Sequence, residues 1–182
     1  MTADSTTARV QRDLLAGKAR DLQMARVSAD ISLEELHDQT ALGVRMARTL
    51  YRHDSIVLES LQALETDGGG RQEIVNEARA WLKAWERLPD ADWTPLPSMT
   101  KVNFSALLED AETKVKALVT ATADDREARR DFNQMLVDLW ADCVDWYLDA
   151  TAVFPEETPD GQLVRAILPH HAPTEGLPDD VK

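Results

Sequence analysis

The longest hydrophobic pattern in the chain runs through residues 32–64, SLEELHDQTALGVRMARTLYRHDSIVLESLQAL. Mostly apolar residues recur in it at alternating steps of three and four, and Thr40, Gly43 and Asp54 are the poor fits in the pattern. The residues of this pattern are Leu33, Leu36, Thr40, Gly43, Ala47, Leu50, Asp54, Val57, Leu61 and Leu64. This spacing is a heptad seam, and it predicts one helix over residues 33–65 that packs in a bundle. The small residues Gly43 and Ala47 leave room on the seam for a neighbouring helix or a bulky side chain.

The start of this helix is predicted by its first residues. Ser32 and Glu35 have the spacing of a capping box, in which the hydroxyl accepts from the Glu35 N–H and the carboxylate reaches back. The box places the helix start at Leu33. A preceding helix over about residues 8–29 should therefore end near Asp30.

The remaining helices follow from apolar spacing, proline stops and a second cap-like pair, Asp124 and Glu127. The predicted ranges are about 72–88, 102–121, 125–153 and a short helix 159–168, with a proline-containing connector at 89–100. Trp81 and Trp85 fall on the apolar stripe of their helix. The fold class is therefore all-α: four to five mostly antiparallel helices form a bundle in a single domain, residues 1–168. A proline-containing, acidic, irregular tail, residues 169–182, follows.

Composition excludes several classes of function. The 182 residues include 20 Lys+Arg and 33 Asp+Glu, a net charge of −13, which opposes binding to nucleic acid or to an anionic membrane. One cysteine rules out an internal disulfide framework and a cysteine-built zinc site, and we expect no cofactor. No apolar run approaches the length of a membrane helix, and the polar residues Met1 to Thr7 lack the pattern of a signal peptide. We therefore expect a cytoplasmic protein.

The negative charge is concentrated near the end of the chain. Residues 131–182 contain eleven acidic and two basic residues. Five aspartates of the predicted helix 125–153 fall within about 60° of one another around its axis. This aspartate stripe consists of Asp131, Asp138, Asp142, Asp145 and Asp149. It is either a solvated face or a docking surface for a basic partner. The apolar arc of the same helix includes Trp140, Cys143 and Tyr147, which we expect to be buried.

Two other features are candidates for partner binding. Arg45, Arg48 and Arg52 also lie within about 60° of one another, away from the heptad seam, and should face solvent or a second chain. Trp93 lies among prolines in a connector of unusual length. That connector should either contact a partner or cap the bundle.

The pair His37-Asp38 has a possible chemistry, since a helical histidine beside a carboxylate can accept a phosphoryl group. The stretch Glu35-Leu36-His37-Asp38-Gln39-Thr40 is similar to the phospho-acceptor box of sensor histidine kinases. That resemblance implies a dimeric helical hairpin that exchanges phosphate with a response regulator.

The sequence therefore predicts a non-enzymatic accessory, adaptor or scaffold protein. Its partner would be a protein with a basic surface or a second copy of the chain, bound at the aspartate stripe. Two alternatives stay open: histidine phosphotransfer through His37-Asp38, and an acidic nucleic-acid mimic that inhibits a DNA-binding protein.

Overall fold

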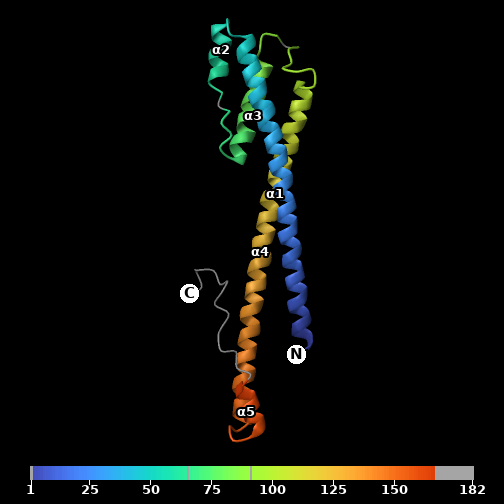
Figure 1. Ribbon diagram of the computed structural model, residues 1–182, viewed down its shortest axis with the longest axis vertical. Coiled ribbons are helices and arrows are strands. Elements are labelled where there is room, and N and C mark those ends of the chain that lie inside the picture. Colours follow the sequence, from blue (N-terminus) through green and yellow to red (C-terminus); the bar gives the residue numbers. More distant parts are fainter. Residues whose placement is uncertain (1, 65, 91, 167–182) are drawn as a thin grey trace. The chain divides into compact units, whose positions relative to one another are not determined.

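The computed structural model describes residues 2–64, 66–90 and 92–166, and within them the chain is all-α, as predicted. It has no strand in these ranges. The helices, shown in Figure 1, are α1 (Thr2–Leu50), α2 (Ser55–Gln62), α3 (Arg71–Glu86), α4 (Lys101–Val153) and α5 (Pro159–Ala166). The predicted acidic tail, 169–182, lies outside the described residues.

The predicted helix start at Leu33 is wrong, because α1 continues through Asp30 and Ser32 without a break. The Ser32 hydroxyl is buried and donates to Asp110 Oδ2 (2.7 Å), a residue of α4. Glu35 does not reach back to Ser32 but accepts from Gln39 one turn later. The residues of the apparent capping box thus make other contacts inside a continuous helix.

The second predicted start, at Asp124, is wrong for the same kind of reason. Residues 122–124 lie inside α4, so the predicted helices 102–121 and 125–153 are one. Asp124 accepts from Lys18 Nζ (2.8 Å), and the buried Asp125 accepts from Arg129 Nε (2.7 Å). Both carboxylates are therefore engaged by cationic side chains and cap nothing.

The predicted helix 33–65 is interrupted at residues 51–54. Asp54 adopts an extended conformation, and its Oδ1 accepts from the backbone N–H groups of Ile56 and Val57. This N-cap begins α2 and removes Asp54 from the seam. The break also leaves Leu50 half exposed.

The other element boundaries are close to the prediction. Helix α3 spans Arg71–Glu86, against the predicted 72–88. Helix α5 begins at Pro159, and the Thr158 hydroxyl accepts from the Gly161 N–H (3.1 Å), as expected for a threonine cap followed by a first-turn proline.

The chain divides into two compact units. Unit 1 comprises the described residues of Met1–Ala19 and Ala123–Lys182, and unit 2 is Arg20–Thr122. Helices α1 and α4 each contribute residues to both.

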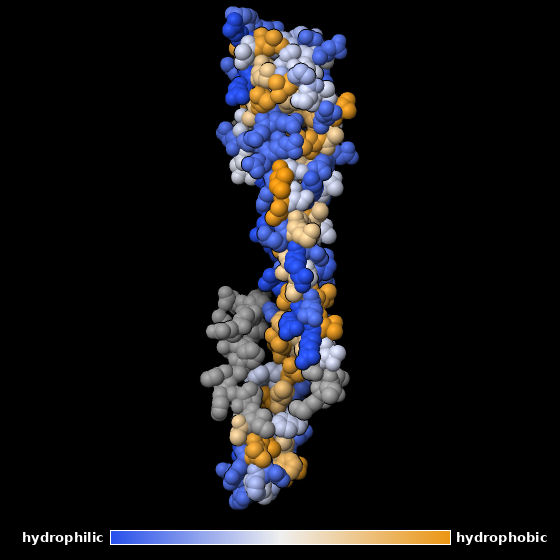
Figure 2. Space-filling view, turned by 45° about the vertical axis from the view of Figure 1, so that its right-hand side comes forward, coloured by the Kyte–Doolittle hydropathy of each residue, from blue (hydrophilic) through white to orange (hydrophobic). Residues whose placement is uncertain are grey.

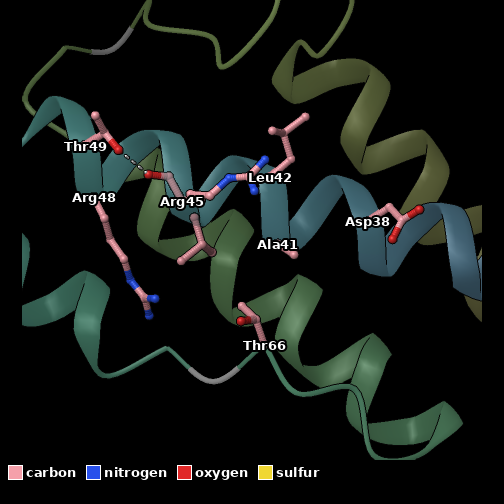
Figure 3. Close-up of a pocket in the computed structure, with 8 residues that line it drawn as sticks. Asp38, Ala41, Leu42, Arg45, Arg48, Thr49 and Thr66 are labelled. Carbon is pink, nitrogen blue, oxygen red and sulfur yellow. Dashed lines mark hydrogen bonds between the residues drawn. The ribbon is translucent and has the colours of Figure 1, made fainter.

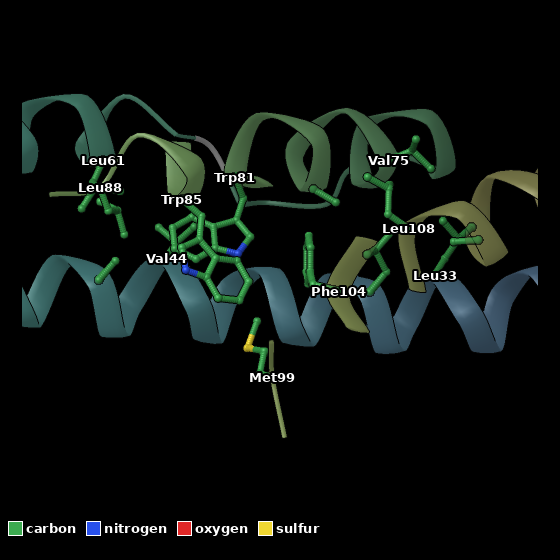
Figure 4. Packing of buried hydrophobic residues seen from close by; sticks show 14 residues of the cluster. Leu33, Val44, Leu61, Val75, Trp81, Trp85, Leu88, Met99, Phe104 and Leu108 are labelled. Carbon is green, nitrogen blue, oxygen red and sulfur yellow. The ribbon is translucent and has the colours of Figure 1, made fainter. Parts of the chain in front are cut away.

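Unit 2 contains the hydrophobic core, in which α1, α3 and the first turns of α4 meet (Figure 4). Trp81 and Trp85 are completely buried, as predicted, and their rings stack at 5.3 Å. The Trp85 ring also meets Phe104 edge-on at 6.1 Å. An aromatic cluster of this kind contributes both buried area and ring geometry to stability.

The predicted space at Gly43 is filled by Trp81. A Cβ atom added to Gly43 would lie 2.8 Å from three atoms of the Trp81 indole. Leu33, Leu36, Thr40, Gly43 and Ala47 are all buried, so this part of the seam faces the core as predicted.

The connector before α4 packs on this core. Trp93 is half-buried, its carbonyl accepts from Trp85 Nε1 (3.0 Å), and its ring meets Trp85 and Tyr51 edge-on. The connector therefore caps the core of unit 2, which was one of the two predicted roles.

Unit 1 buries much less. Its described buried residues are Asp125, Ala128, Ala150, Gly161 and Val164, none with a large side chain. Trp140 and Tyr147, which the apolar pattern assigned to a core, are only half-buried. On the face that Figure 2 displays, hydrophobic side chains reach the surface among hydrophilic ones. The helices of unit 1 thus leave apolar side chains in contact with solvent.

Candidate functional site

The aspartate stripe lies on α4 within unit 1. All five carboxylate residues are exposed. None of them forms an ion pair within the described part of the chain, and the hydrogen bond from Gln134 to Asp138 (2.8 Å) is neutral on the donor side. By contrast, Asp124 and Asp125, earlier in α4, each have a cationic partner. The stripe is thus a run of uncompensated negative charge.

A shallow groove runs beside the stripe. Its volume is about 340 Å³, and Asp131, Asp138 and Asp142 line it together with Met135 and Leu139. Thr7 and Ala8 of α1 form its other side. Carboxylates and apolar side chains therefore meet at one place on the surface of unit 1.

Two large apolar residues flank the stripe. At 100° per residue, Trp146 and Leu148 project to opposite sides of the direction of Asp145 and Asp149. Trp146 is 46% exposed and Leu148 is 58% exposed. Cys143, which we expected to be buried, is also exposed. Exposed carboxylates and exposed apolar side chains thus lie next to one another on this part of α4.

The arginine stripe is only partly as predicted, because Arg48 does not face solvent. Its Nε and Nη2 donate to the carbonyl of Leu61, and Nη2 also donates to that of Leu64, at 2.9–3.1 Å. Arg48 therefore binds one carbonyl in the last turn of α2 and one in the segment that follows this helix. Arg45 and Arg52 are exposed, and Arg52 Nε donates to His53 Nε2 (3.0 Å).

A larger groove, about 720 Å³, lies in unit 2 along α1 (Figure 3). Helical spacing places Asp38, Leu42, Arg45 and Thr49 on the side of α1 that borders it, and Thr66 closes it from the loop after α2. The groove could not be predicted from the sequence, because the residue that completes it belongs to the loop after α2 and not to α1.

His37 faces a different carboxylate from the one that the sequence indicated. Its Nδ1 lies 3.9 Å from Glu77 Oε2 of α3, whereas Asp38 is exposed and borders the groove. The other Glu77 oxygen accepts from the Gly68 N–H (3.0 Å). Gly68 has φ +60°, and a Cβ there would lie 2.7 Å from His37 Cε1, so only glycine fits. The His37 side chain keeps 30% of its surface exposed.

A polar network between α1 and α4 was also missed by the sequence reading. Lys114 Nζ donates to Ser32 Oγ and to Asp110 Oδ2, both at 2.7 Å, and Ser32 donates to the same oxygen. The hydrogen bonds from Lys114 and then Ser32 lower the pKa of Asp110. The cation that faces Ser32 is paired with a carboxylate, so the network is suited to joining the helices rather than to activating the serine.

No family model matches the chain, and no significant match occurs among the curated proteins or the solved structures. Within the described ranges, no three His, Cys, Asp or Glu side chains converge as metal ligands. No helix in those ranges is long and apolar enough to cross a membrane.

Proposed function

We propose that this chain is a non-enzymatic helical protein that acts through protein–protein contacts in the cytoplasm, as an accessory, adaptor or scaffold subunit. The aspartate stripe of α4 would be its docking face. The observation that carries this proposal is the set of five exposed aspartates without a cationic partner in the described chain. We also propose that the helices pack as a mostly antiparallel bundle, as the sequence predicts.

The energetics of α4 support a role for the stripe. Asp138, Asp142, Asp145 and Asp149 are spaced three or four residues apart, where like charges repel by a few tenths of a kcal/mol per pair. Asp149 also lies in the last turns of α4, where the helix dipole disfavours a negative charge. A basic partner would turn both unfavourable terms into favourable ones.

The apolar residues beside the stripe define the partner more closely. A surface that only carried charge would bind any polycation, whereas Trp146 and Leu148 need apolar area opposite them. The partner we propose therefore presents Lys or Arg side chains next to apolar ones. Two more specific partners fit this description. One is a second copy of the chain, which would present Arg45 and Arg52. The other is a DNA-binding protein, for which the stripe would mimic nucleic acid.

The proposal is tested with a charge-reversed stripe, Asp138→Lys, Asp142→Lys and Asp145→Lys. Its matched control, Glu59→Lys, Glu86→Lys and Glu109→Lys, changes the net charge equally at exposed acids of unit 2. The tagged full chains are used to capture partners from the source cells, and the bound proteins are quantified by mass spectrometry. We expect partners that the wild type and the control retain, that the stripe variant loses, and that moderate salt releases. Equal capture by all three chains would contradict the proposal.

Self-association has its own readout. Sedimentation velocity of the purified chain at low and moderate salt shows whether copies associate. If they do so through the stripe, the stripe variant sediments as a monomer and the control associates like the wild type.

A second candidate, histidine phosphotransfer, is favoured by one observation, the orientation of His37 toward Glu77. Nδ1 lies 3.9 Å from Glu77 Oε2, too far for a hydrogen bond. The candidate requires the ring proton on Nδ1, which leaves the lone pair on Nε2, the atom that would accept a phosphoryl group. Incubation with a phosphorylated response regulator or acetyl phosphate should then give acid-labile phosphate that His37→Gln abolishes. His53→Gln, at an exposed histidine, is the control. Absence of acid-labile phosphate would exclude this candidate.

A further inference from the structure

We propose that the groove along α1 in unit 2 binds an organic acid with a single anionic head, either carboxylate or phosphate, and an apolar body. The groove has a volume of about 720 Å³, within the range of small-molecule sites. The groove lies in unit 2, and no residue of the aspartate stripe lines it.

The anionic head is assigned to Arg45. Its guanidinium makes no hydrogen bond or ion pair within the described chain, although it borders the groove. Figure 3 shows Arg45 extended along the surface of α1 beside Leu42. An arginine presents several N–H donors in a planar fork that fits carboxylate and phosphate oxygens.

Arg48 adds positive charge from a fixed position. Three of its hydrogen bonds go to the carbonyls of Leu61 and Leu64, which hold it where the groove meets α2. Three charged residues line the groove, Arg45, Arg48 and Asp38, and their net charge is +1, whereas that of the whole chain is −13. The groove is thus a local positive site on an acidic protein, which favours an anion there over the rest of the surface.

We assign the apolar body of the ligand to the floor of the groove between Asp38 and Arg45. Ala41, Leu42 and Val44 line the groove. Asp38 lies seven residues before Arg45, about 10 Å along the helix axis. A second acidic group at the far end of the ligand would meet Asp38, so a monoacid should bind better than a diacid of equal length. The Thr66 hydroxyl, which has no hydrogen bond within the described chain, is a further donor at the rim.

The test is an NMR titration of the full-length, ¹⁵N-labelled chain. The probes are octanoate and octyl phosphate, which distinguish the two heads, with suberate, octylamine and acetate as comparisons. We expect saturable shifts in amides of residues 38–49 and of Thr66 for at least one of the two monoacids. Suberate should bind more weakly, because its second carboxylate would lie near Asp38. Acetate should also bind more weakly, because it lacks an apolar body. Octylamine, which is cationic, should give no saturable shift.

Two variants assign the contact. Arg45→Gln should weaken the binding of the better monoacid about tenfold, because a charge-assisted hydrogen bond is lost. Arg52→Gln removes an exposed arginine outside the groove and should leave binding unchanged. Unchanged melting temperatures for both variants show that the fold is retained. Absence of saturable shifts, equal binding of octylamine, or full affinity in Arg45→Gln would each overturn the proposal.

Discussion

Gly43 is the residue at which α1 admits the Trp81 indole. Gly43→Ala places a methyl group 2.8 Å from that ring, so we expect a loss of about 1–3 kcal/mol in the free energy of unfolding. Gly17→Ala, in the same helix with open space around it, should instead stabilise by about 0.5–1 kcal/mol. Urea unfolding followed by circular dichroism measures both, and an equal effect of the two substitutions would show that helix propensity alone matters.

Asp110 makes stability depend on pH. Its pKa is lowered in the folded chain by the hydrogen bonds from Lys114 and Ser32. A depressed carboxylate pKa contributes stability that is present above the unfolded value, about 3.9, and is lost as the pH falls through the folded value. Asp110→Asn should therefore destabilise the chain at pH 7 and reduce the further loss of stability on acidification to pH 3.

The control for this prediction is Glu109→Gln, at an exposed neighbour. Ser32→Ala should resemble Asp110→Asn in direction, because it removes one of the two hydrogen bonds. A pH dependence identical in the wild type and in Asp110→Asn would contradict this role.

The contacts of a single residue could be predicted from the sequence only where its size implied a particular kind of neighbour. The small Gly43 predicted a bulky neighbour, and Trp81 occupies that space. Ser32 gave a misleading local signal, since its real partners lie 78 and 82 residues away in the chain. Nothing in the local pattern distinguishes a hydroxyl that caps a helix from one that joins two helices.

At the scale of elements, Asp54 decides where α1 and α2 separate. Asp54→Ala removes the acceptor for two backbone N–H groups and should destabilise the chain by about 1 kcal/mol. Asp67→Ala, at an exposed loop aspartate, is the control and should change stability little. Equal unfolding midpoints for both variants in urea would show that the break at residues 51–54 does not depend on this cap.

The element boundaries show which local signals can be trusted in this chain. Proline signals were reliable, because a missing N–H and a fixed φ act whatever the surroundings, as at Pro159. Signals from side-chain caps were not reliable, because a carboxylate or hydroxyl can instead bind a residue that is distant in sequence. Asp124, which accepts from Lys18, is one such case. Asp54 is the converse, because it lies on the heptad seam and yet caps α2.

At the scale of the whole molecule, the two units differ in how much they bury. Unit 2 holds the cluster around Trp81, Trp85 and Phe104, whereas the described buried residues of unit 1 are small or polar. We therefore expect amides of α3 to exchange hydrogen most slowly and those of residues 142–153 to exchange faster. Hydrogen exchange with mass spectrometry on the full chain measures this, and uniform protection would contradict it.

Composition and periodicity were sufficient for the all-α class, because 3.6-residue spacing recurs through most of the chain. The aspartate stripe was visible for the same reason, since residues on one helix face follow from their numbers. The groove along α1 was not visible, because residues of α1 and Thr66 of the loop after α2 line it together, and no local pattern indicates that they are neighbours.

Cys143 gives the chain a built-in chemical reporter. It is the only thiol, it is exposed, and it lies between Asp142 and Asp145. A maleimide fluorophore would attach at that single position without any engineered residue. At 100° per residue Cys143 projects to the apolar arc of α4 rather than to the stripe. A bound protein that extends from the stripe around the helix would therefore be followed in real time, as slower alkylation of the unlabelled thiol or as a changed emission of the attached dye.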